Sequence, residues 1–272
     1  ALNEDIGDGD FTTKSSFNNE VSGVAHCFVK EKCTIAGVAL AIQICNYLDP
    51  QLEVNFSCKD GDIIEDVPAC IGVISGKLSS ILQIERLLLN TMQRMSGIAT
   101  LTKQYVQLAQ AIGIDIYHTR KTTPNFILPE KWAVEIGGGV NHRFGLDDQI
   151  LIKDNHIKAA GDIQSALDNC LAYCNQQNIQ IPVIVEVKNE LEFLTALKHS
   201  IVNRILIDNH SPEVLEKYIQ YRNSIAPTKK LEISGGINLD NIKPYLIQGI
   251  NCISVGALTH HAISVDISLK IV

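Results

Sequence analysis

The sequence contains no apolar run long enough to cross a membrane and no secretory signal at its start. It also lacks low-complexity tracts, and charged residues make up 19% of its 272 residues, so we expect an ordered globular protein. The formal net charge of −7 argues against a general nucleic-acid-binding protein, which needs a dense basic surface. The first residue is alanine rather than an initiator methionine, which leaves room for a leading segment ahead of it.

None of the eight cysteines forms a C-x-x-C pair. Cys170 and Cys174 are four residues apart on an expected helix and could supply half of a metal site, but no second pair at finger-like spacing completes it. Scattered cysteines without an export signal indicate reduced thiols and a cytoplasmic protein.

Residues 1–97 mix short strands with helices. Apolar residues alternate with polar or small residues over 21–29, and similar strands are expected at 52–56 and 73–77. Helical spacing begins near Gly37 and again over 79–94. This mixture predicts a small α+β sandwich.

From about residue 98 the pattern changes to regular alternation of strands and helices. The expected strands are 114–117, 150–152, 183–187, 205–207, 231–233 and 253–255. The expected helices are 98–111, 161–175, 189–199, 212–221 and 239–248. Such alternation is typical of parallel βαβ units, and the missing G-x-G-x-x-G and Walker motifs argue against a dinucleotide-binding open sheet. We therefore expect a closed or nearly closed β/α barrel.

Nearly every expected barrel strand ends at a charged residue or a glycine. In chain order these ends are Thr119-Arg120-Lys121, Lys153, Glu186, Asp208, Ser234-Gly235-Gly236 and Gly256. Because the carboxyl ends of barrel strands meet at one mouth, these residues should converge. Residues 118–156 hold the cationic clusters Arg120-Lys121, His142-Arg143 and Lys153, which predict a pocket for a small polyanion.

Each of these features also has a plainer explanation. The glycines after the last two strands could present backbone N–H groups to phosphate, or could simply serve tight turns with positive φ. Arg94, Arg120 and Arg143 could grip carboxylates or phosphates, or could be surface and salt-bridge residues. Glu186 and Asp208 could hold Mg²⁺ or sugar hydroxyls, or could neutralise nearby lysines.

Taken together, the motifs resemble those of the quinolinate phosphoribosyltransferases. The similar runs are Glu4-Asp5-Ile6-Gly7, Gln93 to Thr100, Thr119 to Thr122, Gly137 to Leu146, Leu151 to His156, Val185-Glu186-Val187, Ile207-Asp208-Asn209, Ser234 to Ile237 and Ser254 to His260. They span almost the whole chain. The chain departs from the family at His118, at Asn125-Phe126-Ile127 and at Lys188, so we expect the local loop shape and charge to differ there.

The resemblance implies an α/β protein with an N-terminal open sandwich (residues 1–97, joined by 261–272) and an incomplete, seven-stranded type of α/β barrel (98–260). It implies transfer of phosphoribosyl from phosphoribosyl pyrophosphate to quinolinate with decarboxylation, giving nicotinate mononucleotide, CO₂ and pyrophosphate in de novo NAD biosynthesis. It also implies Mg²⁺ as cofactor and a homodimer in which Arg94 reaches the partner's site, with no nucleic-acid or membrane partner.

The same resemblance assigns residue roles. Arg120, His142, Arg143 and Lys153 would grip the two carboxylates of quinolinate. The phosphoribosyl donor would be held, together with Mg²⁺ at Glu186 and Asp208, by Lys121, Ser234, Gly235, Gly236 and Gly256, with His260 as a further candidate. Thr119 would also bind substrate. Lys121, Lys153, Glu186 and Asp208 would form the catalytic set. Two rivals are a nicotinate-using phosphoribosyltransferase and a phosphate-binding regulatory or transport-associated protein that kept the scaffold alone.

Overall fold

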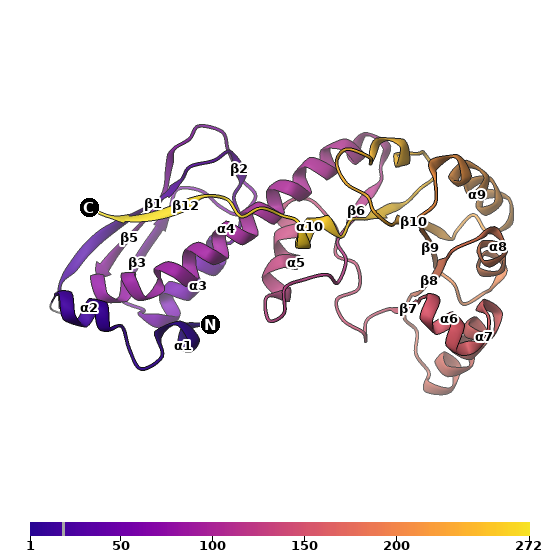
Figure 1. Cartoon of the computed structure of the whole chain (residues 1–272), viewed down its shortest axis with the longest axis horizontal. Coiled ribbons are helices and arrows are strands. Elements are labelled where there is room, and N and C mark those ends of the chain that lie inside the picture. Colours follow the sequence, from indigo (N-terminus) through magenta and orange to yellow (C-terminus); the bar gives the residue numbers. More distant parts are fainter. Residues whose placement is uncertain (18–19) are drawn as a thin grey trace. The chain divides into compact units, whose positions relative to one another are not determined.

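The computed structural model describes residues 1–17 and 20–272 and divides them into two compact units (Figure 1). Unit 1 comprises Ala1–Lys103, Thr122–Gly138 and His261–Val272, and unit 2 comprises Gln104–Lys121 and Gly139–His260. Residues 122–138, which the sequence analysis placed in the barrel domain, therefore group with unit 1. In the described part of the chain, no helix is both long enough and apolar enough to cross a membrane.

Unit 1 is built on a four-stranded antiparallel sheet with the order β12-β1-β5-β3. Its strands are β1 (Ser22–Val29), β3 (Glu53–Phe56), β5 (Ala69–Lys77) and β12 (Ile267–Ile271), and β2 (Cys33–Thr34) pairs separately with β4 (Ile63–Ile64). The helices are α1 (Leu2–Ile6), α2 (Phe11–Ser16), α3 (Val38–Leu48), α5 (Ile127–Ile136) and the first part of α4 (Leu78–Ala109). The predicted strands over 21–29, 52–56 and 73–77 and the helix near Gly37 are confirmed.

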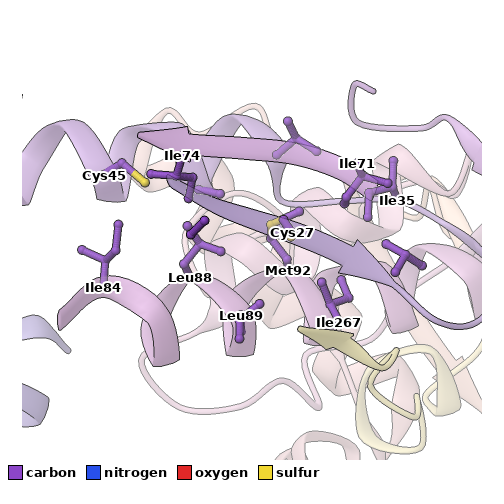
Figure 2. Close-up of a cluster of buried hydrophobic side chains, with 14 of the residues drawn as sticks. Cys27, Ile35, Cys45, Ile71, Ile74, Ile84, Leu88, Leu89, Met92 and Ile267 are labelled. Carbon is purple, nitrogen blue, oxygen red and sulfur yellow. The ribbon is translucent and has the colours of Figure 1, made fainter. Parts of the chain in front are cut away.

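The core of unit 1 lies between this sheet and helix α4. Figure 2 shows Ile84, Leu88 and Met92 of α4 below the strands that carry Cys27 and Ile74. All five side chains are completely buried. Burial of each large apolar side chain of this kind stabilises the fold by about 1.5–3 kcal/mol.

Helix α4 is a single helix, so the prediction of separate helices over 79–94 and 98–111 was wrong. Gly97, which falls between the two predicted helices, lies inside α4. A Cβ atom at this position would lie only 2.0 Å from the carbonyl oxygen of Ile263. The glycine is there because another part of the backbone passes close to the helix, which is a packing reason rather than a turn.

Unit 2 contains a six-stranded parallel sheet with the order β6-β11-β10-β9-β8-β7. The strands are β6 (Asp115–Tyr117), β7 (Ile150–Ile152), β8 (Val183–Val187), β9 (Arg204–Asp208), β10 (Lys230–Ser234) and β11 (Cys252–Ser254). The helices are α6 (Asp154–Ala160), α7 (Ile163–Gln177), α8 (Glu190–Lys198), α9 (Pro212–Ile225) and α10 (Ala257–His260). Figure 1 shows α7, α8 and α9 along the outer side of the curved sheet.

The sheet of unit 2 ends at β6 and β7 among the described residues, so the barrel is incomplete. Val140 makes a single parallel bridge to Tyr117, beside β6 in the position of a seventh strand. The predicted α/β fold class is confirmed. The predicted helix over 239–248 was wrong, because that segment forms only a short 3₁₀ turn, Lys243–Tyr245. Pro244 lies within the turn, and proline inside a longer helix would remove a backbone hydrogen bond.

Candidate active site

The predicted charged residues of unit 2 lie at the carboxyl ends of neighbouring parallel strands. Asp208 ends β9 and is paired in register with Ser234, which ends β10. Glu186 is the last residue but one of β8, the other neighbour of β9. Lys153 follows β7 directly and caps α6. Because all these strands run in the same direction, the four residues come to one edge of the sheet, as the sequence predicted.

Lys153 and Glu186 form an ion pair, with Nζ and Oε2 3.7 Å apart. Glu186 is buried, whereas Lys153 is half exposed. Burial raises the pKa of Glu186; Lys153 lowers it and the negative charge of Asp208 raises it, and the net pKa is above its ordinary value. The carboxylates of Glu186 and Asp208 are close enough to interact, so together they favour a bound cation. The half-exposed ammonium group of Lys153 beside them favours an anion.

Asp208 is fixed by the ends of two strands. Its Oδ1 accepts a hydrogen bond from Ser234 Oγ at 2.6 Å, and its Oδ2 accepts one from Asn209 Nδ2 at 2.7 Å. Gly235 and Gly236 follow with φ of 100° and 61°, conformations that favour glycine. A Cβ on Gly235 would lie 2.3 Å from Asn209 Oδ1. The turn explanation for this glycine pair therefore holds. The segment after the glycine pair does not form the helix that we expected over 239–248. The role of the glycine pair in binding phosphate stays a prediction.

Gly256 brings a second group of predicted residues together. A Cβ on Gly256 would lie 2.9 Å from His260 Nε2 and 3.3 Å from Lys121 Cδ. Thr259 Oγ1 also donates a hydrogen bond to the carbonyl of Lys121 at 2.8 Å. The backbone N–H of Lys121 donates in turn to Thr119 Oγ1 at 3.3 Å. The loop after β6 and helix α10 thus place a lysine side chain and an imidazole beside a residue without a side chain.

Arg120 and Arg143 lie close enough for their charges to interact. Burial lowers the pKa of Arg143, and the positive charge of Arg120 lowers it further. Arg120 is exposed and Arg143 is half-buried. Two guanidinium groups held near each other in this way form a site suited to an anion with more than one carboxylate or phosphate.

His142 is buried and bonded to the interior of unit 2. Its Nδ1 accepts a hydrogen bond from the backbone N–H of Arg143 at 2.7 Å, and its Nε2 lies 3.3 Å from Glu232. Glu232 is fully buried in β10, with Arg204 Nε 3.0 Å away and Ser254 Oγ donating to it. The sequence analysis missed Glu232. The available signal was an acidic residue inside the otherwise apolar run Leu231-Glu232-Ile233.

Arg94 belongs to unit 1, whereas the other predicted site residues belong to unit 2. It lies in the middle of α4 rather than at a helix end, as the sequence analysis had it. Its Nε and Nη2 donate to Glu130 Oε1 at 2.9 and 2.8 Å, and its Nη1 donates to the carbonyl of Ala262 at 2.8 Å.

The departures from the family pattern have simple local structures. Asn125 takes a positive φ of 63°, which asparagine tolerates better than most residues. Lys188 Nζ donates to Asp154 Oδ2 at 2.8 Å, so its charge is compensated on the surface. His118 is fully buried after β6.

Among residues 1–17 and 20–272, no group of three or more His, Cys, Asp or Glu side chains is arranged to hold a metal ion. Cys170 and Cys174 thus form no part of such a group. All eight cysteines are free thiols. Glu186 and Asp208, whose charges interact, contribute two carboxylate groups to the strand ends.

Two family models match almost the whole chain. The N-terminal domain of quinolinate phosphoribosyl transferase matches residues 10–96, and its C-terminal domain matches residues 98–270. The chain belongs to the quinolinate phosphoribosyltransferase family. Like units 1 and 2, these matched ranges divide the chain into two parts. Residues 122–138 belong to the matched C-terminal domain but to unit 1 of the structure.

Curated and solved relatives match this member of the quinolinate phosphoribosyltransferase family over nearly all of its own length. It is 41% identical to quinolinate phosphoribosyltransferase [decarboxylating] 1b of Nicotiana tabacum, a match that covers 100% of this chain and 80% of the relative. It is 37% identical to a probable nicotinate-nucleotide pyrophosphorylase [carboxylating] of Bacillus subtilis, covering 98% and 90%. The crystal structure of NadC from Streptococcus pyogenes superimposes with a TM-score of 0.91 at 35% identity, covering 100% and 94%.

Proposed function

We propose that this protein is a decarboxylating quinolinate phosphoribosyltransferase. It transfers phosphoribosyl from phosphoribosyl pyrophosphate to quinolinate and yields nicotinate mononucleotide, CO₂ and pyrophosphate, a step of de novo NAD biosynthesis. The observation that carries the proposal is the gathering of cations and carboxylates at the carboxyl ends of the parallel strands in a chain of this family.

Two groups of residues at the carboxyl ends of the parallel strands suit the two substrates. Arg120, Arg143 and Lys153 supply the cations that a pyridine with two adjacent carboxylates requires, and His142 lies next to Arg143 in the same segment. The phosphoribosyl donor would be bound by the residues at the ends of the last strands and of β6: Thr119, Lys121, Ser234, Gly235, Gly236, Gly256 and His260. Backbone amides at glycine turns are common phosphate ligands.

Glu186 and Asp208 are proposed to hold Mg²⁺, directly or through water. The fit rests on their oxygen donors, on their mutual repulsion and on the raised pKa of Glu186, which a bound cation would reverse. When bound, Mg²⁺ would neutralise charge on the pyrophosphate. Lys121 would share that task, because it is exposed beside Gly256 and His260.

The order of bond changes follows from the chemistry of the pyridine ring. The ring nitrogen forms a bond to the anomeric carbon of the ribose while the carbon–oxygen bond to pyrophosphate breaks, and its electron pair leaves with the pyrophosphate. The resulting pyridinium can accept the electron pair left when the C2 carboxylate departs as CO₂, and C2 then takes up a proton. Transfer therefore precedes decarboxylation, and the fixed cations contribute by orientation and charge stabilisation.

We also propose that the protein acts as a homodimer in which Arg94 contributes to the partner's active site, and that it works in the cytoplasm. The support for the dimer is the family resemblance around Gln93 to Thr100. The support for the compartment is the set of eight free cysteines.

Turnover of quinolinate and nicotinate by the purified protein tests the proposal. We expect nicotinate mononucleotide and one CO₂ per turnover from quinolinate, with Mg²⁺ and the phosphoribosyl donor both required, and little product from nicotinate. Faster turnover of nicotinate would favour the nicotinate-using rival. Binding of phosphate ligands without any turnover would favour the regulatory rival. Release of CO₂ from quinolinate before the donor is added would overturn the order of steps.

A further inference from the structure

The interior of unit 2 contains a closed ring of four polar and aromatic side chains beneath the strand ends. His142 approaches Glu232 at 3.3 Å, and Glu232 pairs with Arg204 at 3.0 Å. The guanidinium of Arg204 lies over the Tyr117 ring, 5.0 Å from its centroid. Tyr117 meets the His142 ring edge-on, with centroids 5.9 Å apart. Each member is fixed by two others.

Glu232 is the centre of this ring. It lies in β10, and its partners Arg204 and Ser254 come from the two neighbouring strands, β9 and β11. Since side chains alternate along a strand, Glu232 faces the same side of the sheet as Ser234, which bonds Asp208 at the strand ends. Glu232 is thus one layer below the predicted site and does not itself reach the edge.

The contacts of His142 indicate which ring nitrogen carries the proton. Nδ1 accepts the backbone N–H of Arg143, so Nδ1 carries a lone pair. Nε2 faces a carboxylate, so Nε2 carries the proton. These two contacts fit the Nε2–H tautomer of the imidazole. A carboxylate that orients an imidazole from behind is a common way to set which ring nitrogen accepts.

We propose that Glu232 is a positioning residue: through the tautomer of His142 it fixes the backbone of Arg143 and so holds Arg143 beside Arg120. The need for such a device is plain, because the two guanidinium groups repel each other in the free protein. An anion site with its cations already in place binds more tightly than one that must assemble them. The inference rests on the proposed function only for the identity of the anion, quinolinate.

Glu232→Gln tests the proposal, because it keeps the size of the side chain but removes the negative charge and replaces one of the two acceptor oxygens by an NH₂ donor. We expect the KM for quinolinate to rise about tenfold or more while the KM for phosphoribosyl pyrophosphate changes less than about twofold. Ser254→Ala is the matched control, since it removes one hydrogen bond from the same carboxylate and leaves the contact with His142 intact. For this control we expect a lower Tm and a quinolinate KM within about twofold of the wild type.

Nitrogen-15 NMR of the histidine rings gives a readout that a merely structural role would not move. In the wild type, the His142 signals should report the Nε2–H tautomer, and in Glu232→Gln they should show loss of that single form. The proposal is overturned if wild-type His142 is protonated on Nδ1, or if Glu232→Gln lowers Tm but leaves both the tautomer and the quinolinate KM unchanged. If the wild type does not turn over quinolinate, the proposed function fails, while the NMR measurement still decides the role of Glu232.

A second pair of variants keeps the test sharp if Glu232→Gln does not fold. His142→Asn places an amide oxygen near the position of Nδ1 and can still accept the Arg143 N–H, whereas His142→Ala cannot. Partial rescue of the quinolinate KM by asparagine relative to alanine is expected. Equal KM values for the two variants would contradict the positioning role.

Discussion

Arg94 donates two hydrogen bonds to the same carboxylate oxygen of Glu130, at 2.9 and 2.8 Å. Glu130 is fully buried, and it also accepts from the backbone N–H and the hydroxyl of Thr123. A helix residue from the first part of the chain and a helix residue near its middle are thereby joined inside unit 1. Arg94, which the sequence analysis assigned to a substrate site, is thus tightly bound within unit 1.

Glu130→Gln should destabilise the protein by about 2 kcal/mol, because it removes a charged acceptor from a buried pair. Urea unfolding of the whole protein, followed by far-UV circular dichroism, measures the change. The matched control is Glu65→Gln, which breaks the exposed pair of Lys32 and Glu65 and should cost less than about 0.5 kcal/mol. Equal changes in the free energy of unfolding would mean that the buried pair stabilises the protein no more than the exposed pair does.

Arg120→Ala and Lys153→Ala should each weaken quinolinate binding about 10- to 100-fold, since each removes a charge-assisted contact to a carboxylate. Isothermal titration calorimetry gives the Kd, and circular dichroism should show an intact fold. Lys158→Ala is the control, because Lys158 is a lysine on the exposed face of α6 with its side chain 75% exposed. Unchanged Kd values in both site variants would remove the pocket assignment.

Glu186→Gln should raise the Tm at neutral pH. The pKa of Glu186 is raised in the folded state, chiefly by burial, so folding favours the protonated form. Wild-type stability is therefore lost as pH rises from the unfolded-state pKa through the folded-state pKa, and the loss is constant above that. The gain in Tm from the substitution should vanish at acidic pH, and activity should fall at every pH. A lower Tm of the variant at neutral pH would show that the pair with Lys153 outweighs burial.

Gly256→Ala should reduce affinity for phosphoribosyl pyrophosphate more than it reduces stability. Its new methyl group would meet only side-chain atoms, His260 Nε2 at 2.9 Å and Lys121 Cδ at 3.3 Å, and these can move. Gly235→Ala is the contrasting variant, because its methyl group would meet the Asn209 backbone nitrogen at 2.7 Å in a residue with φ of 100°. We expect about 1–3 kcal/mol of destabilisation there. Kd and Tm measured on both variants separate the two effects.

Gly97→Ala tests whether close approach or helix preference decides the residue at this position. Alanine inside a helix is favoured over glycine by about 1 kcal/mol. The new methyl group, however, would lie 2.0 Å from the Ile263 carbonyl oxygen, and backbone cannot turn aside as a side chain does. We expect net destabilisation of about 2 kcal/mol, measured by urea unfolding. A stabilised variant would contradict the close packing of these two segments.

Strand positions were predictable from the sequence because each barrel strand is a short β-branched run bounded by turn residues. The strand ends were predictable for the same reason, and with them the gathering of Lys153, Glu186 and Asp208. Gly97 misled the helix prediction, because a glycine needed for close packing cannot be told from a glycine that ends a helix without knowing what lies opposite. The helix predicted over 239–248 was wrong for a different reason. Its apolar spacing fits a helix, but Pro244 within it does not.

The polar interior could not be predicted in this way. Glu232 contacts His142, Arg204 and Ser254, which come from three separate segments of the chain, and no local spacing reports such a meeting. The same holds for the pairing of Arg94 with Glu130. Contacts between distant segments depend on how the chain folds, and the local spacing of residue types does not predict them.

The antiparallel pairing of β12 with β1 has a consequence for how the protein is made. The first strand of the sheet is synthesised long before its outer neighbour, Ile267–Ile271, leaves the ribosome. During that interval the nascent chain exposes an open row of backbone donors and acceptors, the kind of edge on which chains associate wrongly. Truncation of these last residues should therefore impair the yield of folded protein during translation even though every residue at the strand ends of unit 2 is retained.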